Sequence, residues 1–177
     1  RKDHRTVIVH FANSTDEQVK KIAELGCIVS ANPYYVTGFS GKFSQYGLGE
    51  ERAESMVRLS PVQNLEVPIS LHSDLPMAPA NPLYLAWCAI TRKSTDGKVF
   101  RPDLAVLRHT ALRAITIDAA YSWRMEDKIG SIKTGKNATF TILKGNQYKV
   151  EVDAIKDIQV DATVFEGRLY PVMKAKV

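Results

Sequence analysis

The stretch VPISLHSD at residues 67–74 is the most informative about the fold. Its first five residues predict a short strand, and two similar apolar stretches precede it, TVIVHF at residues 6–11 and CIVSA at residues 27–31. Short, uncharged runs rich in β-branched residues are typical of strands that are buried on both faces of a parallel sheet. Helices between these strands imply right-handed crossovers. The sequence therefore predicts an α/β fold.

The segments between and after these strands carry helix signals. Ser14, followed three residues later by Glu17, fits a capping box that starts a helix, and Gly26 ends it. Further helices are expected over residues 50–57, 61–65 and 82–91, and from Thr110 onward. Residues 32–49 are rich in glycine and aromatic residues, and we expect them to form a long functional or mobile loop.

The pattern changes near Lys128, where glycines begin to separate short runs of alternating β-type residues. These runs cover residues 138–143, 148–152 and 159–165. They predict a small all-β module appended to the α/β part. Three strand–helix units are too few for a closed barrel, which needs eight strands and about 250 residues. The α/β part is therefore either a small open sheet or the last third of a barrel.

Length and composition exclude several classes of protein. A chain of 177 residues with 45% hydrophobic and 24% charged residues is typical of about one soluble globular domain, not of a disordered or coiled-coil protein. The net charge of +5 is dispersed, which argues against nucleic-acid binding. Prolines interrupt the longest uncharged segment, so we expect no membrane span.

Cys27 and Cys88 lie in apolar stretches far apart in the sequence. Two such cysteines indicate free core thiols in a reducing compartment rather than a disulfide framework or a metal site. We therefore expect a cytoplasmic protein. The chain starts at Arg1, so the natural N-terminus and any targeting signal are expected to lie upstream.

Two ionisable residues follow predicted strands at the edge where functional groups of parallel α/β folds collect. His10 ends the first strand, and Asp74 lies three residues beyond the third. An imidazole nitrogen and a carboxylate oxygen both suit zinc, and the carboxylate can take a proton from a metal-activated water. The alternatives are a hydrogen-bonded structural histidine and a turn aspartate.

Other polar residues leave more than one interpretation open. Three interpretations of His72 stay open: a metal ligand, a hydrogen-bond donor to a metal-binding side chain, or a surface residue. The tyrosines of the expected loop either line a pocket or pack the loop down; they are Tyr34, Tyr35 and Tyr46. We expect His4 and His109 to be surface or capping groups.

Taken in order, these motifs resemble the carboxyl-terminal part of the metal-dependent amidohydrolases, in the subgroup called amidohydrolase family 3. His10 is similar to the strand-six metal histidine, and residues 67–74 are similar to the strand-eight signature that ends in Ser-Asp. The other matching stretches are VSANP at 29–33, GLGEERA at 47–53, ALRAITIDAAY at 111–121 and GSIKTGKNA at 130–138.

This resemblance implies a fold and an activity. The fold would be the last strands and helices of a (β/α)8 TIM-type barrel over residues 1–124, followed by part of a composite β-sandwich over residues 125–177. The activity would be hydrolysis of non-peptide carbon–nitrogen bonds in a small amide-type substrate by a metal-activated water. The metal is expected to be zinc, held by His10 and Asp74, with Asp74 also moving the proton. We expect His72 and Tyr34 to contact the substrate.

Departures from the family pattern limit these expectations. The resemblance places the remaining ligands, a His-x-His on strand one, a lysine or glutamate on strand four and a histidine on strand five, before Arg1. This chain alone is therefore expected to be inactive, to bind metal weakly and, because its sheet edges are open, to form a homo-oligomer. Val9 and His72 stand where relatives often carry Glu and Gly. The alternative is a non-catalytic regulatory or binding protein on the same fold, similar to regulators of exoenzyme production.

Overall fold

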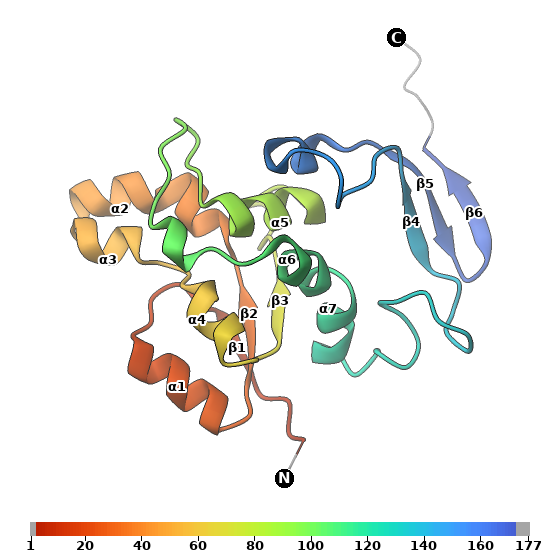
Figure 1. Cartoon of the computed structure of the whole chain (residues 1–177), viewed down its shortest axis with the longest axis horizontal. Coiled ribbons are helices and arrows are strands. Elements are labelled where there is room, and N and C mark those ends of the chain that lie inside the picture. The colour runs from red at the N-terminus through yellow and green to blue at the C-terminus, as the bar shows by residue number, and fades with distance from the viewer. Residues whose placement is uncertain (1–2, 173–177) are drawn as a thin grey trace.

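The computed structural model describes residues 3–172 and contains two sheets (Figure 1). The first is parallel, in the order β1 (Val7–His10), β2 (Ile28–Ala31), β3 (Ile69–Leu71). In its register Val9 pairs with Ser30, which pairs with Ser70. Helices connect and cover these strands, so the prediction of an α/β fold with parallel strands is confirmed.

Helices connect the strands of this sheet and follow it in the chain. They are α1 (Asp16–Glu24), the π-helix η1 (Tyr35–Phe39), α2 (Ser40–Tyr46), α3 (Glu50–Glu54), α4 (Leu59–Asn64), α5 (Pro82–Thr91), the short 3-10 helix η2 (Pro102–Leu104), α6 (Arg108–Ala114) and α7 (Ile117–Ser122). The main core joins one face of the sheet to these helices. Val29 and Ile69 of the sheet belong to one buried cluster with Val19 of α1, Val62 of α4 and Ala86 of α5.

The second sheet is antiparallel, in the order β4 (Phe140–Leu143), β5 (Val160–Phe165), β6 (Arg168–Pro171). Before β5, the 3-10 helix η3 (Val152–Asp157) packs on α5 (Figure 1). The indole Nε1 of Trp87 donates to Asp153 Oδ1 at 3.0 Å, and Ile155 is fully buried in a cluster with Leu83 and Leu112. This contact fastens the segment before β5 to the α/β part.

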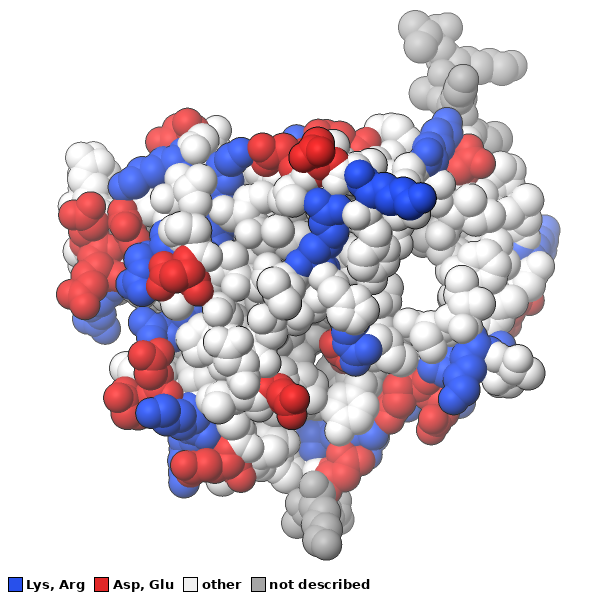
Figure 2. All heavy atoms as spheres, viewed as in Figure 1, with Lys and Arg blue, Asp and Glu red and all other residues white. Residues whose placement is uncertain are grey.

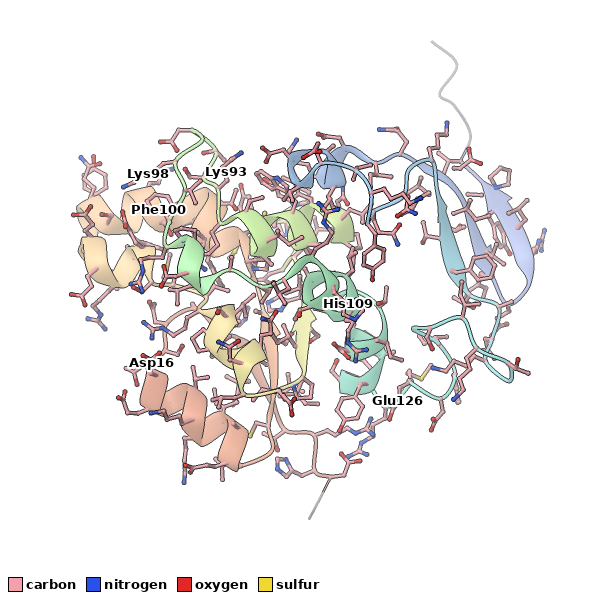
Figure 3. The ribbon with its side chains drawn as sticks, in the orientation of Figure 1. Asp16, Lys93, Lys98, Phe100, His109 and Glu126 are labelled. Atoms are coloured by element: carbon pink, nitrogen blue, oxygen red, sulfur yellow. The ribbon has the colours of Figure 1, made fainter. Side chains whose placement is uncertain are left out.

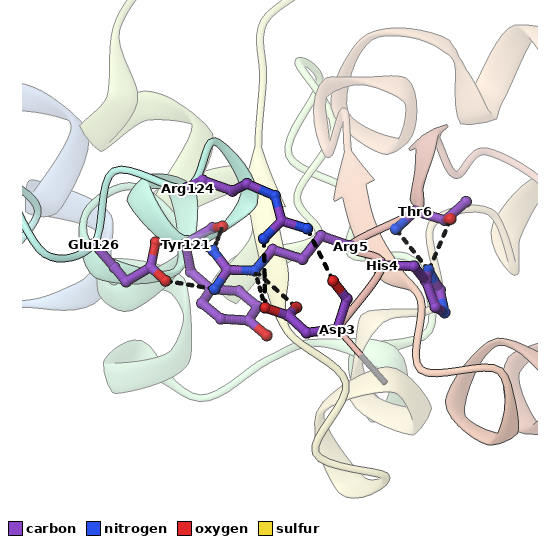
Figure 4. A network of polar contacts seen from close by, with 7 residues as sticks. All are labelled: Asp3, His4, Arg5, Thr6, Tyr121, Arg124 and Glu126. Atoms are coloured by element: carbon purple, nitrogen blue, oxygen red, sulfur yellow. Dashed lines mark hydrogen bonds and ion pairs between the residues drawn. The ribbon is translucent and has the colours of Figure 1, made fainter. Parts of the chain in front are cut away.

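Two buried or half-buried arginines tie distant segments together. The guanidinium of Arg92 donates to four backbone carbonyls, those of Glu54, Met56, Val57 and Phe100. Arg5 donates to Tyr121 O at 2.8 Å and to Glu126 Oε2 at 2.9 Å, and its guanidinium lies 3.9 Å from the centre of the Tyr121 ring (Figure 4). The segment before β1 is thereby held against the end of α7.

The charged groups elsewhere are scattered. On the face drawn in Figure 2, lysines and arginines alternate with aspartates and glutamates. Lys98 is typical, since it pairs with Glu54 at 2.7 Å and lies over the Phe100 ring (Figure 3). Within residues 3–172, no helix has both the length and the apolar character needed to cross a membrane.

Two sequence expectations about the first strand and helix are wrong. β1 is not buried on both faces, because Ile8 packs against the core while Val9, on the opposite face, is 56% exposed. α1 is capped by Thr15, not by Ser14. The Thr15 side chain accepts from Gln18 N, and the Gln18 side chain accepts from Thr15 N at 2.9 Å, which is a capping box displaced by one residue.

Residues 32–49 are not a long loop, because η1 and α2 occupy most of them. The glycines that suggested a loop lie within or beside helices. A Cβ on Gly38 would lie 2.7 Å from the Tyr34 ring, so glycine there lets that ring pack against the helix backbone. Glycine at this position reflects close packing rather than a turn.

Two expectations in the second half are also wrong. Thr110 lies inside α6 and does not cap it, and the helix stops before Thr116, whose hydroxyl donates to Leu112 O at 2.7 Å. Such a side-chain bond competes with helix continuation, so α7 starts as a separate helix. Residues 148–152 form no strand, because the Asn146 side chain and carbonyl accept from the following backbone amides and make a turn. β6 was not predicted.

Candidate metal centre

The carboxyl ends of β1 and β3 bring His10, His72 and Asp74 to one edge of the parallel sheet. The backbone pairing continues past the strand ends, since Asn32 N donates to His10 O at 3.3 Å and His72 N donates to Ala31 O at 3.0 Å. His10 and His72 are thus aligned on either side of the end of β2. Asp74 follows two residues after His72.

A change of backbone direction points the His10 side chain toward this edge. Strand alternation would put His10 on the core-facing side with Ile8. Instead His10 and Phe11 both have positive φ, 69° and 44°. Phe11 consequently enters the core, where it is 4% exposed, and the His10 side chain is left 49% exposed. Asp74 also has positive φ, 52°. Ten non-glycine residues of the described chain have positive φ, so this conformation sets the direction of these side chains and does not by itself mark a functional site.

Three polar atoms surround the Nδ1 atom of His10. The Tyr35 hydroxyl oxygen lies 3.2 Å away, His72 Nε2 lies 3.4 Å away and Asp74 Oδ2 lies 3.8 Å away. The Asp74 side chain is 43% exposed, so this group of atoms opens to solvent. His10 Nδ1 is the atom on which the site converges.

His72 is held by the sheet behind it. Its Nδ1 lies 3.0 Å from the Ser30 hydroxyl, and its Nε2 faces His10. Burial lowers the pKa of His72 below its ordinary value, and the neighbouring His10 lowers it further, while the charge of Asp74 opposes them. Burial has the largest effect, so the neutral form of His72 is favoured.

Asn32, at the end of β2, joins the two sides of the site. Its side chain is fully buried, its Oδ1 accepts from Tyr34 N at 3.1 Å, and its Nδ2 donates to Ser73 O at 3.2 Å. One amide group therefore holds both the start of the η1 segment and the backbone next to Asp74. The sequence analysis did not single out this residue for a positioning role.

Of the two adjacent tyrosines, Tyr35 reaches the site. The Tyr34 ring packs against Phe39 and Tyr84, with ring centres 5.8 Å and 6.2 Å away. Burial, and secondly the charge of Asp74, raise the pKa of Tyr35, so its phenol stays protonated at neutral pH. Substrate contact by Tyr34 stays a prediction, while Tyr35 is the tyrosine that contacts His10.

The remaining histidines and cysteines lie in other settings. His4 bonds to Thr6 Oγ1 and Leu25 O, and His109, on α6, contacts the Tyr148 hydroxyl (Figure 3). Cys27 and Cys88 are both free and buried, as expected.

The donor atoms of His10 and Asp74 are compatible with one shared ion. Zinc–nitrogen and zinc–oxygen bonds of about 2.0–2.2 Å place tetrahedral ligands about 3.3–3.6 Å apart. The observed 3.8 Å between His10 Nδ1 and Asp74 Oδ2 is close to this separation. Across residues 3–172, however, no group of three or more His, Cys, Asp or Glu side chains is arranged to hold a metal ion. The described residues therefore contain two donor atoms at a spacing that suits one ion, not a full set of three.

Comparison with known proteins identifies the family. The model of the Amidohydrolase family matches residues 1–170, nearly the whole chain. The chain belongs to the amidohydrolase family. Within it, the chain is 30% identical over 155 residues to the N-substituted formamide deformylase of Arthrobacter pascens. That match covers 86% of this chain and 28% of the relative, so the chain spans between a quarter and a third of the relative's length.

Solved structures of other proteins share the fold of this chain. An uncharacterized metal-dependent hydrolase from Pyrococcus furiosus is 27% identical, with a TM-score of 0.59 over 73% of this amidohydrolase chain and 26% of its own. An adenosine deaminase from Xanthomonas campestris with bound zinc is 18% identical, with a TM-score of 0.66 over 92% of this chain and 36% of its own. At this identity the second likeness concerns the fold alone.

Proposed function

We propose that this chain is part of a metal-dependent amidohydrolase that cleaves a non-peptide carbon–nitrogen bond. The observation that carries the proposal is the 3.8 Å separation of His10 Nδ1 and Asp74 Oδ2 at the carboxyl edge of a parallel sheet, in a chain of this family. Functional groups of barrel enzymes collect at this edge.

The two residues have distinct tasks. A divalent ion, for which zinc is our proposal, acts as a Lewis acid and lowers the pKa of water to near 7. His10 would hold the ion through Nδ1. Asp74 would hold it through Oδ2, and because this carboxylate is partly exposed, it can also accept the proton of the attacking water. His72, with its Nε2 facing His10, borders the place where substrate would bind.

The architecture we propose is the end of a (β/α)8 barrel over residues 1–124 and part of a β-sandwich over residues 125–177. The parallel order of β1, β2 and β3 and the antiparallel order of β4, β5 and β6 support it. A catalytic zinc site needs three protein ligands. We therefore place the missing ligands on earlier barrel strands of the full-length protein, and we expect the 177-residue chain alone to be inactive.

The substrate class we propose is a small amide. The formamide deformylase relative makes N-substituted formamides the first compounds to assay. A non-catalytic regulatory or binding role is the alternative, and it predicts that the zinc-loaded full-length protein hydrolyses no amide.

The test of this function uses His10→Ala and Asp74→Asn in the full-length protein. We expect both variants to lose bound metal, measured by elemental analysis. We also expect their rate of hydrolysis to fall more than about 100-fold, because mutation of residues that only hydrogen-bond to metal ligands already lowers activity by up to about 100-fold. Matched controls are His109→Ala on α6 and Asp127→Asn, an exposed carboxylate. Unchanged metal content and hydrolysis in both site variants would contradict the proposal.

A further inference from the structure

The hydroxyl of Tyr35 has a polar partner that metal binding would remove. It lies 3.2 Å from His10 Nδ1, which is also the His10 atom nearest to Asp74 Oδ2. An imidazole nitrogen has one lone pair, so Nδ1 cannot both bind an ion and accept a hydrogen bond from the phenol. Once an ion occupies that lone pair, the Tyr35 hydroxyl lies beside the ion and no longer has His10 Nδ1 as its hydrogen-bond acceptor.

The fold holds this hydroxyl in place independently of His10. Tyr35 is the first residue of the π-helix η1, and short π segments frequently occur at functional sites. Asn32 fixes the backbone at Tyr34, and the missing Cβ of Gly38 lets the Tyr34 ring pack against the helix. The Tyr35 ring packs against the main core. The Tyr35 hydroxyl therefore stays at the edge of the sheet when His10 binds a metal ion.

We propose that the Tyr35 hydroxyl is the hydrogen-bond donor to the carbonyl oxygen of the bound substrate, beside the ion held by His10 and Asp74. This proposal rests on the proposed function. A donor fixed where negative charge develops on an acyl oxygen stabilises the transition state more than the ground state. Tyr35 would then be a catalytic residue that contacts substrate, in addition to the two metal ligands.

The competing explanation is that Tyr35 only positions the His10 ring. The two roles predict different effects of Tyr35→Phe, which removes one oxygen and keeps the ring packed. A positioning role predicts weaker zinc binding. A donor role predicts unchanged zinc binding but weaker binding of any ligand that presents an oxygen to the ion.

The experiment measures zinc and formate binding by calorimetry on the full-length protein, with formate as a one-carbon carboxylate probe. For Tyr35→Phe we expect an unchanged zinc dissociation constant and, in the zinc-loaded protein, formate affinity reduced about tenfold or more, since a hydrogen bond to a charged group is lost. Hydrolysis should fall about 100-fold or more in kcat. Tyr46→Phe, at a tyrosine 79% exposed on α2, is the matched control and should change none of these values.

One result would overturn the proposal while leaving the proposed function intact: unchanged formate affinity of the zinc-loaded Tyr35→Phe variant, whether or not its zinc binding is weakened. A wild-type protein that binds no zinc contradicts the proposed function itself, and the Tyr35 assignment with it. Retention of zinc and hydrolysis by His10→Ala and Asp74→Asn does the same.

Discussion

Asn32 is the residue whose side chain connects the parts of the site. Its amide is fully buried and bonds to Tyr34 N on one side and Ser73 O on the other. The two segments that these bonds connect are far apart in the sequence, because η1, α2, α3 and α4 lie between them. This planar group therefore links the segments that carry Tyr35 and Asp74, in addition to the pairing of β2 with β3.

Replacing Asn32 by alanine should destabilise the protein. The change leaves Tyr34 N without its acceptor and removes one of the two hydrogen bonds that Ser73 O accepts, the other coming from Ala78 N. We therefore expect the free energy of unfolding to fall by about 1–3 kcal/mol. Denaturant titration measures the loss, and Asn13→Ala, at an exposed asparagine, is the control and should change stability by less than about 0.5 kcal/mol. An equal effect of the two substitutions would show that the Asn32 bonds are not formed.

The sequence predicts the placement of some side chains of the site and not of others. That His10 and Asp74 come together could be predicted, because both follow parallel strands whose carboxyl ends share an edge. Which tyrosine faces them could not, because Tyr34 and Tyr35 point in different directions only once η1 has formed. The reversal of strand alternation at His10 also depends on positive φ, which no local pattern indicates.

Among the elements, α1 offers two overlapping start signals, Ser14 with Glu17 and Thr15 with Gln18. The structure uses the second, and Ser14 Oγ is buried without a hydrogen-bond partner. We expect Thr15→Ala to lower the free energy of unfolding by about 1 kcal/mol, the usual effect of losing a cap. Ser14→Ala should be neutral or slightly stabilising, because it removes an unpaired buried hydroxyl. Thermal unfolding of the two variants would give the reverse order if Ser14 were the cap.

Elements with an unambiguous local signal were predicted well. α5 begins at Pro82, with Asn81 accepting from the first backbone amides, and the predicted range 82–91 is the observed one. Elements that depend on tertiary contacts were not. The η1 and α2 helices form where glycines suggested a loop, and Asn146 turns the chain where alternating residues suggested a strand. In these places packing and side-chain bonds to the backbone override local preference.

For the molecule as a whole, the contact between the segment before β1 and the end of α7 closes the α/β part (Figure 4). Its polar centre is Arg5 with Glu126, and the bond from Arg5 is the main reason that the pKa of Glu126 is lowered from its ordinary value of 4.5. A carboxyl group with a lowered pKa stabilises the fold above its unfolded-state pKa and loses this contribution as pH falls through the folded-state pKa.

Glu126→Gln should therefore lower the thermal unfolding midpoint at pH 7 and should do so less and less below about pH 4.5, where the wild-type contribution is lost. Unfolding midpoints between pH 7 and pH 3 measure this difference. Asp127→Asn, next to it and exposed, should show a much smaller difference. A Glu126→Gln effect that is constant across this pH range would contradict the role of the ion pair.

The exposed edge strands β1 and β6 are relevant to the oligomeric state. Val9 on β1 and Leu169 on β6 are each more than half exposed, at 56% and 57%. Exposed apolar residues on edge strands favour pairing with another chain or another part of the same protein. The homo-oligomer stays a prediction, which sedimentation at several concentrations would test.

The proposed function requires that His10 and Asp74 share one metal ion. The most direct measurement is an anomalous difference map at the zinc absorption edge from crystals of the zinc-loaded full-length protein. We expect a peak within about 2.3 Å of both His10 Nδ1 and Asp74 Oδ2. A zinc peak that contacts neither atom, with the ion bound entirely by other residues, would contradict it.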